Sequence, residues 1–268
     1  MKDQFASRPS GSTTGALTYC LHHVTLLLET NSYVRVLLVD FSKAFDVVNH
    51  ALLIPKLLSI ELTDNIHNWI RPISFLSGRT QFSKIGDTFS TYTAITRSII
   101  PGSGFGLTAY VIMEGDLHPI SEINRPFKFA DDVNLIVPEK TDCCLLEEFD
   151  HIKKLARANY NKMIINLCKA KETVLKNSNP RLYLSPHKLD AIEQVLEAKL
   201  FGVVFDHRLN FDTHLHFVLT LCSQRVYLLT LLRDHGLSHI NLDIILQAIM
   251  ISRISYAISA RGGFFVFC

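Results

Sequence analysis

Two short segments carry carboxylates where a strand would end. Residues 36–46 read VLLVDFSKAFD and contain Asp40, and residues 127–137 read FKFADDVNLIV and contain Asp131 and Asp132. An apolar run rich in Val, Leu and Ile is typical of a buried strand, and the sheet then fixes a carboxylate at its end. We therefore expect three carboxylates to face one cleft.

This carboxylate cluster predicts hard-metal chemistry. Crowded carboxylates repel one another, and without a cation at least one would shift toward its neutral form. Mg²⁺ (or Mn²⁺) prefers oxygen ligands, and two such ions about 4 Å apart stabilise the attacking and leaving oxygens of a phosphoryl transfer. The pattern thus predicts nucleotidyl transfer at a site that contains Asp40, Asp131 and Asp132. Because Asp-Asp is also common in solvated β-turns, residues 127–137 alone leave that alternative open.

Five motifs follow one another in a specific order. They are residues 40–45 (DFSKAF), 100–107 (IPGSGFGL), 129–132 (FADD), 158–171 (ANYNKMIINLCKAK) and 199–203 (KLFGV). In this order they resemble motifs A, B, C, D and E of the reverse transcriptase domain of a non-LTR (LINE-like) retrotransposon. Upstream, residues 5–14 (FASRPSGSTT) resemble the last fingers segment before the palm. The resemblance covers most of the chain.

The resemblance implies an α+β fold, a right-hand polymerase palm with partial fingers and a helical thumb. The implied divisions are a fingers segment over 1–32, a palm over 33–206 and a thumb-like segment over 207–268. Hydrophobic periodicity and turn residues agree with a mixed α and β chain. The expected helices are 12–28, 52–60, 66–76, 106–117, 144–163, 213–233 and 240–260, and the expected strands or hairpins are 34–41, 81–89, 127–137, 173–176 and 200–205.

The resemblance implies that Asp40 and Asp131 are the catalytic metal ligands, with Asp132 as a further ligand or an orienting carboxylate. It also implies substrate contacts. Phe45 corresponds to a bulky ring that excludes the sugar 2′-hydroxyl, and the backbone of Phe41 approaches the triphosphate. In the motif B loop, Gly102, Ser103 and Gly106 lie where backbone comes close to the nascent base pair. The remaining contacts come from three cations: Lys169 or Lys171, of which one would serve the leaving pyrophosphate, and Arg8, which would meet template or triphosphate.

The implied activity is RNA-directed DNA synthesis, with an RNA template, a DNA primer and deoxynucleoside triphosphates (dNTPs). Several positions depart from the family pattern: Pro101 and Leu107 replace Gln and Pro, Ala170 replaces Thr, and Arg261 replaces Trp. Proline cannot replace an amide side chain that supports the template. A partial, catalytically inactive relic that folds and binds RNA or an RNA–DNA hybrid is therefore the second hypothesis. An unrelated metal-dependent phosphohydrolase is the third.

Composition is compatible with all three hypotheses without selecting among them. The net charge of +2 does not by itself indicate nucleic acid, but residues 153–176 contain seven Lys or Arg and one Glu. A local basic stretch suits phosphate contacts, and a solvated helix face is its alternative. Six cysteines without paired spacing and no secretory signal predict an intracellular protein. The resemblance implies action in the nucleus if the protein is functional. Polar residues interrupt the apolar run 244–260, so we expect no membrane span there.

Overall fold

The computed structural model describes residues 3–61, 63–65, 78–100, 102–157, 163–177 and 185–262. It divides into two compact units. Unit 1 comprises residues 1–11, 37–137 and 141–170, and unit 2 comprises residues 12–36, 138–140 and 171–268. The predicted divisions at 32/33 and 206/207 do not coincide with these units and stay a prediction.

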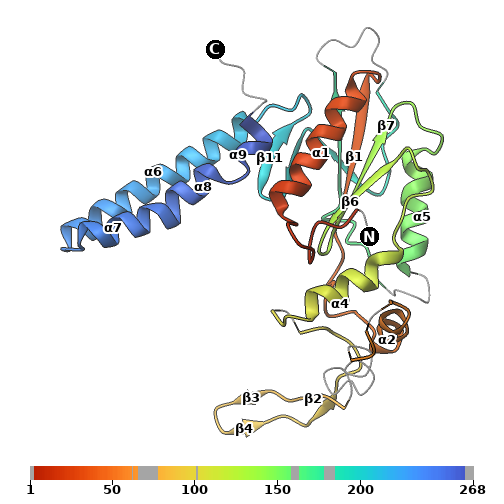
Figure 1. The fold of residues 1–268 in the computed structure, drawn as a ribbon, viewed down its shortest axis with the longest axis horizontal. Coiled ribbons are helices and arrows are strands. Elements are labelled where there is room, and N and C mark those ends of the chain that lie inside the picture. Colours follow the sequence, from red (N-terminus) through yellow and green to blue (C-terminus); the bar gives the residue numbers. More distant parts are fainter. Residues whose placement is uncertain are drawn as a thin grey trace. The chain divides into compact units, whose positions relative to one another are not determined.

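The centre of unit 1 is an antiparallel hairpin of β6 (Arg125–Phe129) and β7 (Asp132–Pro138), and β7 is hydrogen-bonded on its other side to β1 (Tyr33–Val39) (Figure 1). Every residue of β7 except Asp132 is buried. Such continuous burial explains why the residues after Asp132 are apolar without alternation, apart from the buried Asn134, as in a central strand. The two strands predicted to carry the carboxylates are therefore confirmed as neighbours.

Four helical segments of unit 1 are described: α2 (His50–Leu58), α4 (Gly106–Met113), the 3₁₀ turn Glu114–Asp116 and α5 (Leu145–Arg157). Helix α5 is amphipathic as predicted and buries a stripe of apolar residues around Phe149. Its expected extension to Met163 is wrong, because α5 ends at Arg157 and Met163 is not helical; the Met163 amide donates to the carbonyl of Ala156 at 2.8 Å. The helix predicted over 66–76 lies outside the described residues.

A two-stranded ribbon also belongs to unit 1. Strands β3 (Lys84–Ile85) and β4 (Thr88–Phe89) form the predicted hairpin, and Gly86 in its turn has φ +58°. Positive φ is the conformation that Gly adopts without steric penalty, so the Gly-Asp dipeptide specifies this turn. Strands β2 (Thr80–Gln81) and β5 (Thr93–Ala94) continue the ribbon.

Unit 2 begins with α1 (Thr13–Leu28), whose amino end is capped by the Ser12 hydroxyl, a residue type that favours this position. Strand β8 (Lys171–Lys176) neighbours β1 in the sheet and pairs in parallel with β9 (Glu193–Val195). Strands β10 (Glu197–Leu200) and β11 (Val203–Asp206) form the hairpin expected for motif E. The Arg35 guanidinium on β1 forms a buried ion pair with Glu172 on β8 at 2.7 Å.

The carboxy-terminal part of unit 2 is a helical hairpin. Helix α6 (Asp212–Asp234) lies beside a second helical segment made of α7 (His239–Leu246), a π-helical stretch (Gln247–Ile251) and α8 (Ser252–Ser255) (Figure 1). The chain then breaks at Ala257, which has φ +53°, and resumes as α9 (Ile258–Arg261). The single helix expected over 240–260 is therefore wrong at its end.

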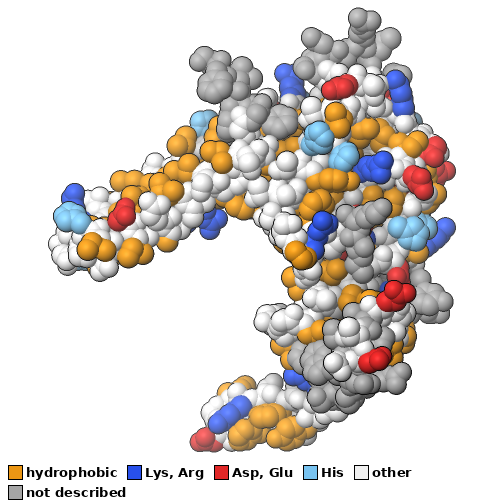
Figure 2. All heavy atoms as spheres, in the orientation of Figure 1, with side chains coloured by type: hydrophobic (Ala, Val, Ile, Leu, Met, Phe, Trp, Pro, Cys, Tyr) orange, Lys and Arg blue, Asp and Glu red, His pale blue; other side chains and the backbone are white. Residues whose placement is uncertain are grey.

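This hairpin exposes many apolar side chains, and Figure 2 shows hydrophobic atoms along the face in view. By length and composition alone, Asp212–Asp234 and His239–Arg261 are long and apolar enough to cross a membrane, whereas little of either is buried in the structure. Helices of soluble proteins also pass this test, so it is weak evidence. The expectation of no membrane span stays a prediction.

Candidate active site

Asp40 lies directly after β1, and the chain that follows it is held by the segment 164–166. The Asn166 amide donates to the Asp40 carbonyl at 2.8 Å, and the Ser42 amide donates to the Ile164 carbonyl at 2.8 Å. Phe41, predicted to lie in the strand, instead forms an isolated antiparallel bridge with Ile165. Motif D thus fixes the end of motif A through backbone hydrogen bonds.

Asp131 and Asp132 lie at the turn of the β6–β7 hairpin, where Phe129 pairs with Asp132. Ala130 has φ +53°, a left-handed conformation that is rare for a residue with a Cβ. Although Asp132 reaches solvent, desolvation by the surrounding protein and the charges of Asp131 and Asp40 raise its pKa to about 6. The three predicted carboxylates therefore share one electrostatic environment.

The structure distinguishes the two lysines of motif D. Lys169 lies in the turn that follows Asn166, and its Nζ is 3.6 Å from Asp40 Oδ2. Lys171 instead begins β8 and forms an ion pair with Glu193 on β9, both in unit 2. The geometry thus brings Lys169, and not Lys171, to the carboxylate cluster.

Phe45 packs against a ring that sequence reasoning missed. Its ring centroid lies 4.8 Å from that of Tyr110 on α4, with an interplanar angle of 33°. Tyr110 is fully buried and donates its hydroxyl to Met163 Sδ at 3.7 Å. Burial, followed by the charges of Glu114, Asp131, Asp132 and Asp40, raises the pKa of Tyr110 well above its usual value. Tyr110 is therefore a neutral platform for Phe45 in the neighbourhood of the carboxylates.

The motif B loop is organised by its own side chains. Ser103 Oγ donates to the Ile100 carbonyl at 2.8 Å and accepts from the Gly106 amide at 3.0 Å, at the start of α4. A Cβ on Gly106 would lie 2.6 Å from the Ile100 carbonyl oxygen, so a glycine is required here by the loop itself. Around Gly102, in contrast, the space is open. Pro101 lies outside the described residues.

The cations predicted to meet phosphate are dispersed. Arg8 is exposed, donates to the Gln4 carbonyl at 3.2 Å and lies over the Phe5 ring. On α5, Lys153 forms an ion pair with Asp150 at 2.6 Å. Helix α5 therefore supplies part of the basic stretch 153–176, whereas Lys169 and Lys171 lie on other elements and are already paired.

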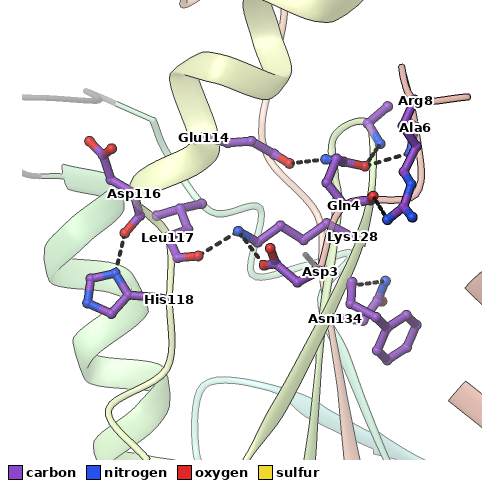
Figure 3. Close-up of polar contacts among 12 residues, drawn as sticks. Asp3, Gln4, Ala6, Arg8, Glu114, Asp116, Leu117, His118, Lys128 and Asn134 are labelled. Carbon is purple, nitrogen blue, oxygen red and sulfur yellow. Dashed lines mark hydrogen bonds and ion pairs between the residues drawn. The ribbon is translucent and has the colours of Figure 1, made fainter. Parts of the chain in front are cut away.

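A polar network that the motifs did not indicate lies beneath the carboxylate turn (Figure 3). Gln4 and Glu114 are buried and joined by a hydrogen bond of 2.7 Å. Lys128, also buried, forms an ion pair with Asp3 at 2.9 Å and donates to the Leu117 carbonyl at 2.5 Å. Burial raises the pKa of Glu114 well above its ordinary value, and the nearby Lys128 only partly opposes this effect.

Hard-metal ligation fits the donor chemistry of the site. Asp40 Oδ2 is buried and accepts no hydrogen bond, and its carboxylate shares the local field with Asp131 and Asp132. A carboxylate oxygen without a hydrogen bond, with the Lys169 ammonium 3.6 Å away as its ion-pair partner, retains lone pairs that suit Mg²⁺. The carboxylates do not converge on a single point, however: among the residues that the structure describes, no three His, Cys, Asp or Glu side chains form a ready metal cluster.

Comparisons with known proteins show which sequences this chain resembles. No family model matches it. It is 24% identical over 244 residues to the probable RNA-directed DNA polymerase from transposon BS of Drosophila melanogaster, a match covering 83% of this chain and 26% of that protein. The chain thus spans about a quarter of this curated relative. The predicted resemblance to a transposon reverse transcriptase is confirmed by this similarity.

Two solved telomerase structures resemble this chain to different degrees. The apo telomerase of Candida tropicalis, truncated from the C-terminal domain, matches with a TM-score of 0.54 and 12% identity, over 79% of this chain and 40% of that one. Telomerase of Candida albicans in complex with a TWJ fragment of telomeric RNA matches with a TM-score of 0.47 and 9% identity, over 75% of this chain and 33% of that one. The predicted α+β polymerase fold is confirmed by the first match.

Proposed function

We propose that this chain, reverse-transcriptase-like in sequence and fold, is the polymerase region of a retrotransposon RNA-directed DNA polymerase. Its substrates would be dNTPs, an RNA template and a DNA primer with a free 3′-hydroxyl, and its place of action would be the nucleus. The observation that carries the proposal is that Asp40, directly after β1, and Asp132, at the start of the adjacent strand β7, are close enough for their charges to interact.

Asp40 and Asp131 would hold Mg²⁺ or Mn²⁺, with Asp132 as a further ligand or an orienting carboxylate. Bound divalent ions supply charge neutralisation at the attacking and leaving oxygens of an in-line displacement. Phe45, backed by Tyr110, would press against the sugar 2′ position and select deoxynucleotides. Lys169 would neutralise the pyrophosphate, because its flexible side chain already lies beside Asp40.

The test is primer extension by the purified chain on an oligo(dT)-primed RNA template with Mg²⁺, beside an Asp131→Ala variant. We expect extension by the wild type and its loss in the variant. A Phe45→Ala variant is expected to incorporate ribonucleotides that the wild type rejects. Release of phosphate or of cleaved nucleic acid without extension would contradict the proposal and support a phosphohydrolase.

One observation favours a second function, a relic that binds an RNA–DNA hybrid without catalysis. The carboxylates do not form a ready metal cluster among the described residues, and Pro101 stands where the family has Gln. Hybrid binding by a folded protein that extends no primer, in the wild type and in Asp131→Ala alike, would establish this second function.

A further inference from the structure

The turn that carries Asp131 needs an external restraint. Ala130 adopts φ +53°, which disfavours a residue with a Cβ by about 1–2 kcal/mol relative to the right-handed region. A conformation of this kind persists where surrounding contacts over-determine it. One such contact lies at the turn itself, where the Ala130 amide donates to Gln4 Oε1 at 3.3 Å.

Gln4 is itself firmly held. Its Oε1 also accepts the Ala6 amide at 2.9 Å, and its Nε2 donates to Glu114 Oε1 at 2.7 Å (Figure 3). Its backbone lies in a parallel bridge with Lys128 on β6, in which the Phe5 amide donates to the Lys128 carbonyl at 2.9 Å. The residue is only 3% exposed, so water does not substitute for these partners.

The amide side chain suits this position because it combines an acceptor with a donor. Its oxygen receives two backbone N–H groups, one before the Asp131–Asp132 pair and one in the amino-terminal segment. Its nitrogen faces a carboxyl group at the end of α4, the helix that also carries Tyr110. Gln4 thus joins three segments of unit 1 that are far apart in the sequence.

We propose that Gln4 is a positioning residue that orients Asp131 and Asp132 by fixing the turn before them. It acts through the Ala130 amide and, on its other side, through Glu114. This inference rests on the proposed function, because that function is what requires Asp131 and Asp132 to be oriented. The restraint that Gln4 places on the turn does not depend on the proposed function.

The test compares Gln4→Met with a matched control, Gln194→Met, which removes an amide in unit 2 whose Nε2 donates to Glu172 at 3.4 Å. Met preserves the length and much of the volume of Gln but not its hydrogen bonds. Amide hydrogen exchange of Ala130 and the affinity for Mn²⁺ are measured in both. For Gln4→Met we expect faster exchange at Ala130 and Mn²⁺ affinity weakened about ten- to a hundredfold.

Rescue separates positioning from general destabilisation. Gln4→Glu alone places its carboxyl group opposite that of Glu114. Gln4→Glu combined with Glu114→Gln exchanges the donor and the acceptor between the two positions and rebuilds the hydrogen bond. The double variant is therefore expected to recover most of the lost Ala130 protection and Mn²⁺ affinity. If the double variant regains thermal stability but its Ala130 amide is no better protected from exchange, the proposal is overturned.

The two proposals fail in different ways. A wild-type chain that binds no Mn²⁺ would overturn the metal site of the proposed function, and Ala130 exchange would still decide the role of Gln4. Ala130 exchange in Gln4→Met equal to that in wild type and in Gln194→Met would overturn the positioning role, whatever the metal affinity.

Discussion

The buried ion pair of unit 2 makes a quantitative prediction. Arg35 Nε donates to Glu172 Oε1 at 2.7 Å, and the two side chains are 11% and 0% exposed. The second oxygen of Glu172 accepts no hydrogen bond, and Gln194 reaches the first only at 3.4 Å. Removing the guanidinium in Arg35→Met leaves a buried carboxylate nearly uncompensated, so the free energy of unfolding should fall by about 3–5 kcal/mol.

The assay is urea denaturation of the whole chain, with the midpoint and slope compared between variants. Replacing both partners, as in Arg35→Met with Glu172→Leu, removes the charge imbalance and should return stability to within about 1 kcal/mol of wild type or above it. The control is Lys171→Met, which breaks the more exposed pair with Glu193 and should change stability by about 0–1 kcal/mol. A loss for Arg35→Met no larger than for this control would refute the reasoning.

Three further predictions concern other positions. His214 on α6 is buried with neither ring nitrogen hydrogen-bonded, and burial, with the charges of Arg261 and Lys199, lowers its pKa. The unfolded chain binds a proton at this histidine near pH 6.5, whereas the folded chain does so only at lower pH. Stability should therefore fall as pH drops below about 6.5. Denaturation measured against pH should show a smaller fall for His214→Phe and an unchanged fall for the control variant His216→Phe. Gly106→Ala should shift the Ile100–Ser103 loop and destabilise the chain by about 1–3 kcal/mol, because its Cβ would lie 2.6 Å from a carbonyl oxygen; a crystal structure with an unmoved loop would contradict this. Lys169→Met should leave thermal stability unchanged and slow primer extension about 10²–10⁴-fold, whereas Lys171→Met should not slow it comparably.

The strands that carry the carboxylates could be predicted because the signal is local. The apolar runs before Asp40 and after Asp132 are long enough to identify buried strands, and the Asp pair between two such runs indicates a tight turn. The Gly-Asp turn of the β3–β4 ribbon and the Ser12 cap of α1 were predictable for the same reason. In each case the residues that determine the structure are neighbours in the sequence.

The network around Gln4 could not be predicted in this way. Gln4 and Glu114 are 110 positions apart, and each alone resembles an ordinary polar surface residue. The buried state of Glu114 depends on where α4 ends relative to the hairpin, which no periodicity reveals. The same holds for Tyr110, whose apolar neighbours indicate a core helix and not a place near carboxylates.

The choice between Lys169 and Lys171 also required the fold. The sequence offers two lysines at alternate positions, but the turn at Asn166 ends before β8 begins at Lys171. Strand pairing directs Lys171 toward Glu193, and the turn leaves Lys169 beside Asp40. A single intervening residue thus places the two side chains in different units.

The Lys169–Asp40 ion pair means that the site already contains a counter-ion, the ammonium group at the end of a flexible side chain. An ammonium group on a flexible stem stays at high local concentration near the carboxylate, so a dissolved cation must compete with it before it can bind. The Lys169–Asp40 ion pair is weak, because the Lys169 side chain is 69% exposed and salt screens its charge. If the site binds a divalent ion as proposed, that ion would displace the Lys169 ammonium from Asp40 and free it to contact substrate phosphate. Under the proposed function, Lys169 would thus neutralise Asp40 in the empty site and the pyrophosphate in the loaded site.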